Sequence, residues 1–321
     1  MSGITVRKFE PSDYPSQKAT HDSIFPDHPM FLDEVRYEDS CYGRTRYRMK
    51  RFVAETASGQ VVGFGEYKHL FFGYHPKRFA LGIEVSPEWH RQGAGNILYA
   101  VLMKELAEEG AEVATSLVLS TSAAGIMFVR NRGSVEKRRT IESRLELDAF
   151  DPAKFSGSVE SVKKTGIEVT SLSSELSRIP SCGRLLKDLE DSGAADVPGL
   201  IADSPMDYHD YEIVILDNPN VIWEGSFVAR EGDRYLGSST LLRSGGEGLV
   251  GQGFTVVRPE YRGKGIAQAV KVKAAAWAKS KGLKYIRTHN DAENAPMLAI
   301  NRKIGFAKRA EWVTFERRLS E

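Results

Sequence analysis

The sequence predicts an α/β protein that consists of two copies of one domain, and three observations lead to this prediction. The chain has 321 residues, which is about the length of two ordinary domains. A short motif with two glycines occurs twice, 172 residues apart. In both copies the motif lies between a strand-like and a helix-like segment, and the same series of elements follows it.

The two copies of the motif read PEWHRQGAG at residues 87–95 and PEYRGKGIA at residues 259–267. Internal repeats decide how many domains a chain holds, so they are the first feature to seek. Gly133 and Gly305 each end a later predicted helix and are again 172 residues apart. No net insertion therefore separates the loop from the next helix end in the two copies.

The predicted boundary between the copies lies in a segment rich in residues that break secondary structure. Residues 151–158 read DPAKFSGS. We therefore predict an N-terminal domain at residues 1–152 and a C-terminal domain at residues 163–321. Residues 192–205 are also polar and contain Gly and Pro, which predicts a loop within the second domain.

The same predicted elements occur in the same order in each copy. Strands are marked by β-branched and aromatic residues, and helices by apolar residues three and four positions apart. Pro87 and Pro259 end the strands before the loops, because proline cannot donate to a β-ladder. In the first copy we predict strands at 4–6, 52–54, 80–85, 113–119 and 140–147, and helices at 97–106 and 123–132. In the second copy we predict strands at 167–169, 213–216, 227–229, 253–257, 284–288 and 312–319, and helices at 266–277 and 296–304.

The composition excludes several classes of protein. Lys and Arg number 44 and Asp and Glu number 43, so the net charge is +1, without the basic excess of a nucleic-acid-binding protein. Two cysteines are too few for a disulfide framework or a four-cysteine zinc site, and they suit a reducing cytoplasm. The sequence has no apolar run of about 20 residues and no signal-peptide core, so we expect a cytoplasmic protein without a membrane partner.

The glycine-rich loops have the features of a phosphate-binding site. At a strand-to-helix junction the first N–H groups of the helix lack partners and lie at the positive end of the helix dipole. Gly263 and Gly265 let the backbone approach a ligand closely, and Arg262 and Lys264 add positive charge. A phosphate or pyrophosphate is the expected ligand. The sequence lacks a nucleotide P-loop and a complete dinucleotide fingerprint, and the alternative interpretation of either loop is a tight turn.

The segment TVVRPEYRGKGIA at residues 255–267 resembles the acetyl-CoA loop of the GCN5-related N-acetyltransferases (GNAT). The pattern of that family is [QR]-x-x-G-x-[GA] after a strand, and Arg262, Gly265 and Ala267 satisfy it. The later segments NDAENAPM at 290–297 and NRKIGF at 301–306 resemble the next motif of the family. The whole chain resembles tandem GNAT proteins, which implies two domains that each have a central mixed β-sheet flanked by helices.

The resemblance implies that acetyl-CoA (coenzyme A) is the cofactor and indicates which residues bind it. The strand backbone would bind the pantetheine arm, and the loop would bind the pyrophosphate. The site in the second domain then comprises Thr255, Val256, Val257, Arg262, Gly263, Lys264, Gly265, Ile266, Ala267, Asn294 and Asn301. A second cofactor site would comprise Val85, His90, Arg91, Gln92, Gly93, Ala94, Gly95 and Asn96 in the first domain.

The first domain departs from the family pattern. His90 stands at the leading [QR] position, Ser122 stands where the second copy has Asn294, and Ser134 replaces Phe306. We therefore predict that the C-terminal domain is the main catalytic domain. The N-terminal domain either binds acetyl-CoA weakly or serves as a structural partner.

The resemblance implies direct transfer of an acetyl group to an amine, with a backbone N–H of residues 255–257 polarising the thioester carbonyl. The amine must be neutral to attack, so a base or a chain of waters is needed. The family often has a Tyr four residues before the Gly-Phe pair as the acid for the leaving thiolate. This sequence has Asn301 there, and an amide cannot donate a proton as a phenol does. The sequence therefore identifies no catalytic residue, and the seven histidines show no spacing that predicts a metal site.

Three further features each have two interpretations. Glu84 is either a general base or a solvent-facing strand residue. The basic run at 44–51 is either a solvated strand face or a site for an acidic substrate or the 3′-phosphate of CoA. A polar and aromatic cluster is predicted to be a loop surface rather than a substrate-binding wall; its members are Asp203, Asp207, Tyr208, His209 and Tyr211.

The function that the sequence favours is acetyl transfer from acetyl-CoA to a primary amine of a small molecule, mainly in the C-terminal domain. One alternative is a non-catalytic acyl-CoA-binding or sensing protein, because no acid or base is evident. Another is a protein or peptide acetyltransferase. We expect a monomer or homodimer that binds no nucleic acid.

Overall fold

The computed structural model describes residues 3–194 and 205–319, and the chain forms two compact units. Unit 1 comprises Met1–Arg138 and Trp312–Glu321, and unit 2 comprises Arg139–Glu311. These units differ from the predicted boundaries, because the last strand of each sequence copy belongs mainly to the other unit. Both copies end with a similar strand pattern, so the sequence carries no signal of this exchange.

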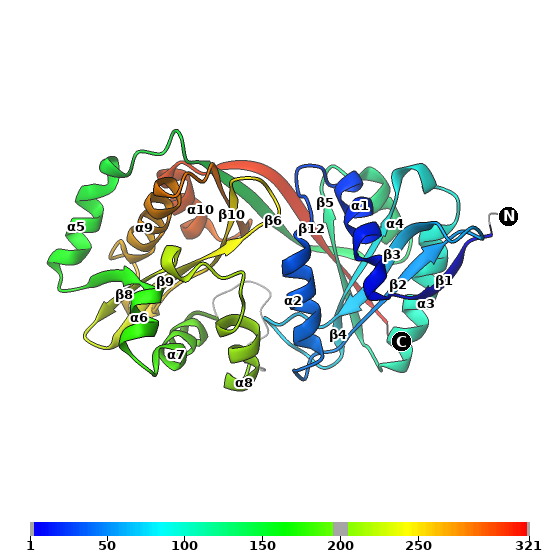
Figure 1. Cartoon of the computed structure of the whole chain (residues 1–321), viewed down its shortest axis with the longest axis horizontal. Coiled ribbons are helices and arrows are strands. Elements are labelled where there is room, and N and C mark those ends of the chain that lie inside the picture. The colour runs from blue at the N-terminus through cyan, green and yellow to red at the C-terminus, as the bar shows by residue number, and fades with distance from the viewer. Residues whose placement is uncertain (1–2, 195–204, 320–321) are drawn as a thin grey trace. The chain divides into compact units, whose positions relative to one another are not determined.

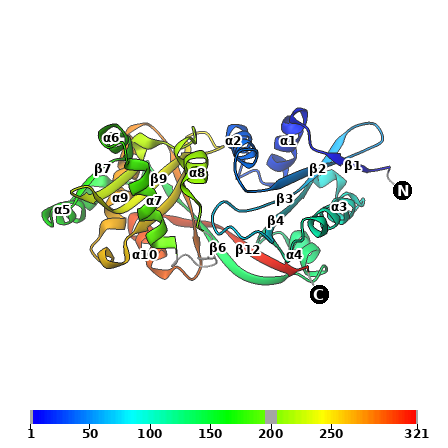
Figure 2. The same ribbon diagram turned by 90° about the horizontal axis from the view of Figure 1, so that it is seen from below.

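Unit 1 is a mixed sheet with helices on both faces. Its strand order is β1 (Thr5–Lys8), β2 (Met49–Glu55), β3 (Val61–Lys68), β4 (Arg78–Val85), β5 (Val113–Leu119) and the Trp312–Arg318 part of β12 (Ala307–Arg318). Only β4 and β5 pair in parallel. Helices α1 (Tyr14–Ile24) and α2 (Leu32–Tyr42) lie on one face, and α3 (Ala94–Glu108) and α4 (Ala123–Arg130) lie on the other (Figure 2). Leu98, Leu102 and Leu106 of α3 are fully buried against the strands, as their helical spacing predicts.

Unit 2 repeats this arrangement. Its strand order is β6 (Val135–Glu146, which pairs from Thr140), β11 (Tyr285–Asp291), β10 (Leu249–Val257), β9 (Arg234–Arg243), β8 (Phe227–Glu231) and β7 (Glu168–Ser171). Helices α9 (Ile266–Ser280) and α10 (Ala295–Ile304) lie on one face of the sheet, and α7 (Cys182–Ala194) and α8 (Tyr208–Tyr211) lie on the other (Figure 1). Two further helices, α5 (Ser156–Lys164) and α6 (Leu172–Arg178), precede α7.

Four local predictions are wrong at least in part. The predicted loop at 192–205 starts too early, because residues 192–194 still belong to α7, and residues 195–204 lie outside the described residues. Residues 213–216 belong to a π-helix, Glu212–Leu216, because an apolar run this short fits a buried helical turn as well as a strand. Residues 151–158 are largely helical, since Asp151 caps the turn Pro152–Phe155, which leads into α5. In the basic run at 44–51 the strand begins only at Met49, so Arg44, Arg46 and Arg48 do not share a strand face. The other predicted strands and helices are present, with ends shifted by a few residues.

The described helices include none that is both long enough and apolar enough to cross a membrane. In the same described ranges, no three His, Cys, Asp or Glu side chains come together in a way that could hold a metal ion.

Candidate functional site

The two glycine-rich loops have the same backbone geometry. Each begins with a 3-10 turn, Pro87–Trp89 or Pro259–Tyr261, and leads into a helix of 15 residues. The residue before each helix, Gly93 or Gly265, has a left-handed φ of 98° or 82°. The helices therefore begin abruptly, and their first N–H groups point toward the loop without intrahelical acceptors.

The leading residue of each motif closes its loop by the same contact. Arg262 Nε donates to the carbonyl of Val257 at 3.2 Å, and His90 Nε2 lies 2.9 Å from the carbonyl of Val85. Val85 and Val257 are the last residues of β4 and β10. The imidazole of His90 thus makes the same contact as the guanidinium of Arg262, although the sequence pattern treats His90 as a departure.

The strand before each loop diverges from its parallel neighbour. Pairing of β10 with β11 ends at Gln252 and Thr288, and pairing of β4 with β5 ends at Ala80 and Thr115. On its other side, β10 has a bulge between Gln252 and Thr255. The edge of β10 that carries residues 255–257 is therefore available to bind an extended ligand through its backbone.

Buried polar side chains gather where β10 and β11 diverge, on the face that α9 covers. Lys271 of α9 is 2% exposed, and its ammonium donates to Oε1 of Gln252. Gln252 Nε2 donates to Ser239 Oγ at 2.9 Å, and Ser239 Oγ lies 2.8 Å from Thr255 Oγ1. Burial lowers the pKa of Lys271 to about 7.

Asn301, at the position of the family's tyrosine, belongs to the same face. Its Nδ2 donates to Asn290 Oδ1 of β11 at 2.6 Å, and its own Oδ1 is buried without a partner among the described residues. Asn294 has a structural role, since its Oδ1 accepts from Met297 N and caps α10. Ser122 caps α4 in the same way, so the Ser-for-Asn difference between the copies preserves the cap.

On the opposite face of unit 2, α7 covers the strand that leads to the loop. A Cβ on Gly193 would lie 2.3 Å from Cγ2 of Val256, so the helix backbone contacts the strand directly. Glu190, one turn earlier, is 8% exposed, and burial raises its pKa to about 7. Burial and the charge of Glu190 together raise the pKa of Tyr211, which is 2% exposed. For Tyr211 the predicted loop surface is therefore wrong, while Asp203 lies outside the described residues.

Unit 1 has an acid–base pair on the matching face. Nδ1 of His21 lies 3.0 Å from Oε1 of Glu84, and Nε2 lies 3.0 Å from the carbonyl of His28. Burial opposes the charged ring, but the hydrogen bond and charge of Glu84 outweigh it and raise the pKa of His21. The rings of Phe25 and His28 pack on Trp312 beside this pair. Glu84 is thus neither an isolated base nor a freely solvated residue.

The basic run at 44–51 is largely neutralised within unit 1. Arg48 pairs with Glu109, and Lys50 pairs with Glu105 at 2.7 Å. Arg51 is 7% exposed and pairs with Asp39 and Glu66. These contacts account for much of the positive charge of the run.

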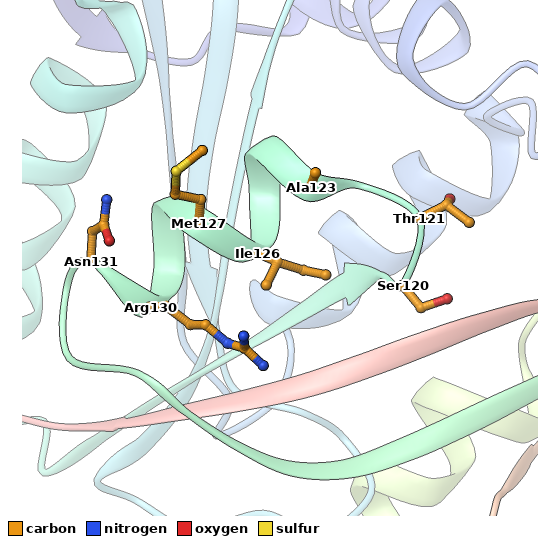
Figure 3. A pocket seen from close by; sticks show the side chains of 7 residues that line it. All are labelled: Ser120, Thr121, Ala123, Ile126, Met127, Arg130 and Asn131. Atoms are coloured by element: carbon orange, nitrogen blue, oxygen red, sulfur yellow. The ribbon is translucent and has the colours of Figure 1, made fainter.

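An open hollow of about 480 Å³ lies on α4 and does not include the loops. Figure 3 shows its lining side chains on α4 and on the turns before and after it, and these are Ser120, Thr121, Ala123, Ile126, Met127, Arg130 and Asn131. Phe128 belongs to α4 but not to this lining, and lies next to Gly95 of α3. The hollow contains none of the residues predicted to bind acetyl-CoA.

The sequence matches the model of the acetyltransferase (GNAT) family at residues 13–132 and 194–306. The chain therefore belongs to the GNAT family of acyltransferases, whose members use acetyl-CoA, and it is a tandem member with two copies of the fold. Among curated proteins, none matches the sequence.

Solved structures with the same tandem fold include two that match along nearly their whole length. A GCN5-related N-acetyltransferase from Sphaerobacter thermophilus is 13% identical, with a TM-score of 0.74 over 100% of this chain and 97% of its own. A tandem GNAT protein from the clavulanic acid biosynthesis pathway is 15% identical, with a TM-score of 0.76 over 99% of each chain. A glucosamine N-acetyltransferase region of a fungal multi-domain enzyme is 17% identical, with a TM-score of 0.74, over 99% of this chain and 38% of that one.

Lys271 and Glu190 were not identified as candidate residues from sequence. Lys271 does leave a signal, because it interrupts the apolar stripe of α9 between Val270 and Ala274. Glu190 leaves a similar signal beside Leu186 and Leu189, on the buried face of α7. A charged residue in an apolar stripe is thus the pattern that would have found both.

Proposed function

We propose that the protein transfers the acetyl group of acetyl-CoA to a primary amine of a small molecule, mainly in unit 2. This proposal rests on one observation: β10 stops pairing with β11 at Gln252, and the same strand then runs directly into the Arg262–Ala267 loop. Space above the loop is open, since a Cβ on Gly263 would meet no atom within 4 Å. The exposed side chains of Arg262 and Lys264 supply charge for a pyrophosphate.

Glu190 is the proposed general base. A carboxylate that titrates near pH 7 can accept a proton from an ammonium substrate at neutral pH. The amine nitrogen then bonds to the thioester carbon, a backbone N–H of residues 255–257 stabilises the oxyanion, and the carbon–sulfur bond breaks. Both the base and the β10 backbone lie on elements in direct contact, α7 and β10.

Unit 1 is the second proposed acetyl-CoA site, comprising Val85 and residues 90–96. Its support is the loop geometry shared with unit 2 and the contact from His90 to Val85. The His21–Glu84 pair gives this unit titratable groups of its own on the matching face. This observation favours a second, weaker site over a purely structural partner.

Transfer of radiolabelled acetyl groups to a panel of small amines and peptides tests the proposal. We expect transfer to at least one small amine, with a large loss of kcat in Glu190→Gln. Asp191→Asn is the matched control, because Asp191 is the next residue of α7 but is exposed and pairs with Lys187 of the same helix. Tight acetyl-CoA binding without transfer would support the sensor alternative, and transfer to peptides alone would support a protein acetyltransferase.

A further inference from the structure

Lys271 is an unusual residue for the interior of a domain. A buried ammonium is costly unless a carboxylate compensates for it. In the described part of the chain, burial alone accounts for the shift in the pKa of Lys271, and no carboxylate contributes to it. Its ammonium contacts the neutral amide of Gln252 and faces the ring of Phe306, whose centroid lies 5.1 Å from Nζ. Methionine or leucine would fill this space at a lower cost.

The amine of Lys271 lies at the point where the strands separate. Gln252, which it contacts, is the last residue of β10 that pairs with β11. Asn290 lies on the diverging part of β11, and Asn301 reaches it from α10. α9 and β10 thus place one hydrogen-bonded polar pair, and α10 and β11 place another, next to the point where β10 and β11 stop pairing. Oδ1 of Asn301 is buried and has no hydrogen-bond partner among the described residues, so the protein's own groups do not satisfy every buried acceptor there.

Gln252 also fixes the orientation of the amine. Its Nε2 donates to Ser239, so its Oε1 is directed toward Lys271. One N–H of the ammonium is used in this contact, and the described residues show no hydrogen bond from the other two, which can therefore serve a ligand in the diverging region. Lys271 therefore points a positive charge at the place where the proposed function puts the sulfur end of the pantetheine arm.

We propose that Lys271 stabilises and protonates the thiolate of coenzyme A as the acetyl group leaves. This inference rests on the proposed function. The acceptor nitrogen forms the new bond to the acetyl carbon, the carbon–sulfur bond breaks, and the electron pair stays on sulfur. The ammonium of Lys271 gives a proton to that sulfur and becomes a neutral amine, which solvent then reprotonates. Asn301 cannot perform this step, because an amide has no proton to give at neutral pH.

The test measures ionisation of the thiol in bound coenzyme A and needs no acceptor amine. Free-thiol coenzyme A is bound to a Gly93→Trp protein, in which the unit 1 loop is obstructed, and thiolate absorbance is followed against pH. Desulfo-coenzyme A supplies the baseline. We expect the bound thiol to ionise at a pH at least one unit below that of free coenzyme A. Lys271→Met should remove this shift and lower the thiolate fraction about tenfold at a given pH.

Lys273→Met is the matched control, because Lys273 lies on the same helix but is exposed. It should leave the thiol pKa unchanged. Calorimetry and urea unfolding show that each variant folds and binds coenzyme A. If coenzyme A binds and its thiol has the same pKa in Lys271→Met and in wild type, the role of Lys271 is overturned but the proposed function is not. If coenzyme A does not bind, or if Lys264→Glu does not weaken its binding, the proposed function is overturned as well.

Discussion

Arg91 and Gly263 occupy the same position in the two loops and share a left-handed backbone, with φ of 63° and 76°. Among the described residues, Arg91 is the one non-glycine residue with a positive φ. This conformation costs an L-residue about 1–2 kcal/mol. Strain of this kind persists where the direction of the backbone matters. Unit 1 therefore keeps the loop conformation of unit 2 in spite of its different sequence.

Replacing Arg91 by glycine should relieve this strain. We expect Arg91→Gly to raise the free energy of unfolding of unit 1 by about 0.5–1 kcal/mol, because the relieved strain exceeds the entropy cost of glycine. Urea unfolding measures the change. Gln92→Gly, the neighbour without a positive φ, should instead lower stability by a similar amount. Equal losses in both variants would show that the Arg91 backbone is not strained.

The buried amine of Lys271 should make unit 2 more stable as the pH rises from about 7 to 10.5. Its folded pKa is lowered to about 7 from an ordinary 10.5, so the unfolded chain binds more protons in this range. The slope contributed by one such group is about 1.4 kcal/mol per pH unit. Lys271→Met should flatten the slope in urea unfolding at several pH values, whereas Lys273→Met should retain it. A slope that persists in Lys271→Met would mean that other groups cause it.

Glu190 should make unit 2 less stable as the pH rises from about 4.5 to 7, which is the opposite of the effect of Lys271. Its folded pKa is raised to about 7 from 4.5, so the folded protein holds the proton more tightly and loses stability as the pH rises between these values. Glu190→Gln should remove this loss. In the acetyl-transfer assay the same residue should produce a rise in kcat through about pH 7. A pH profile unchanged in Glu190→Gln would exclude Glu190 as the base.

The ion cluster of Arg51 should be essential to unit 1. Burial opposes ionisation of Glu66, yet the charges of Lys68 and Arg51 lower the pKa of Glu66 to about 2. Arg51→Met removes the cation that pairs with Asp39 and one of the two cations beside Glu66, and should cost about 3–5 kcal/mol. Lys50→Met, which removes a half-exposed ion pair, should cost about 1 kcal/mol or less. If urea unfolding shows similar losses of stability in Arg51→Met and Lys50→Met, burial does not make the Arg51 ion pairs more important than the Lys50 pair.

The GNAT fold and the order of its elements could be predicted from sequence, because both depend on local patterns. Hydrophobic periodicity and the prolines at 87 and 259 define the strand, loop and helix of each copy. The exchange of final strands could not be predicted, since β6 and β12 have similar patterns and pairing is decided by long-range contacts. The π-helix at 212–216 was missed because a short apolar run has no distinct period.

The loop residues of the candidate site follow a motif of the sequence, whereas the contacts of its titratable groups do not. The loop is a contiguous motif, but Lys271 meets Gln252 only through the packing of α9 on β10, and Asn301 meets Asn290 only through the packing of α10 on β11. The equivalence of His90 and Arg262 depends on geometry, because two different side chains can offer an N–H to the same carbonyl. A sequence motif specifies residue types, so it misses a histidine that makes the same contact as an arginine.

Calorimetric titration with acetyl-CoA tests the central claim most directly, using wild type and two matched loop variants. Lys264→Glu and Gln92→Glu place an acidic side chain at the same exposed position of each loop. Each should repel a pyrophosphate without disturbing the fold. We predict that Lys264→Glu weakens the tighter site at least tenfold, and that Gln92→Glu affects only a weaker site. Absence of binding in wild type, or tight binding unchanged in Lys264→Glu, would contradict the account.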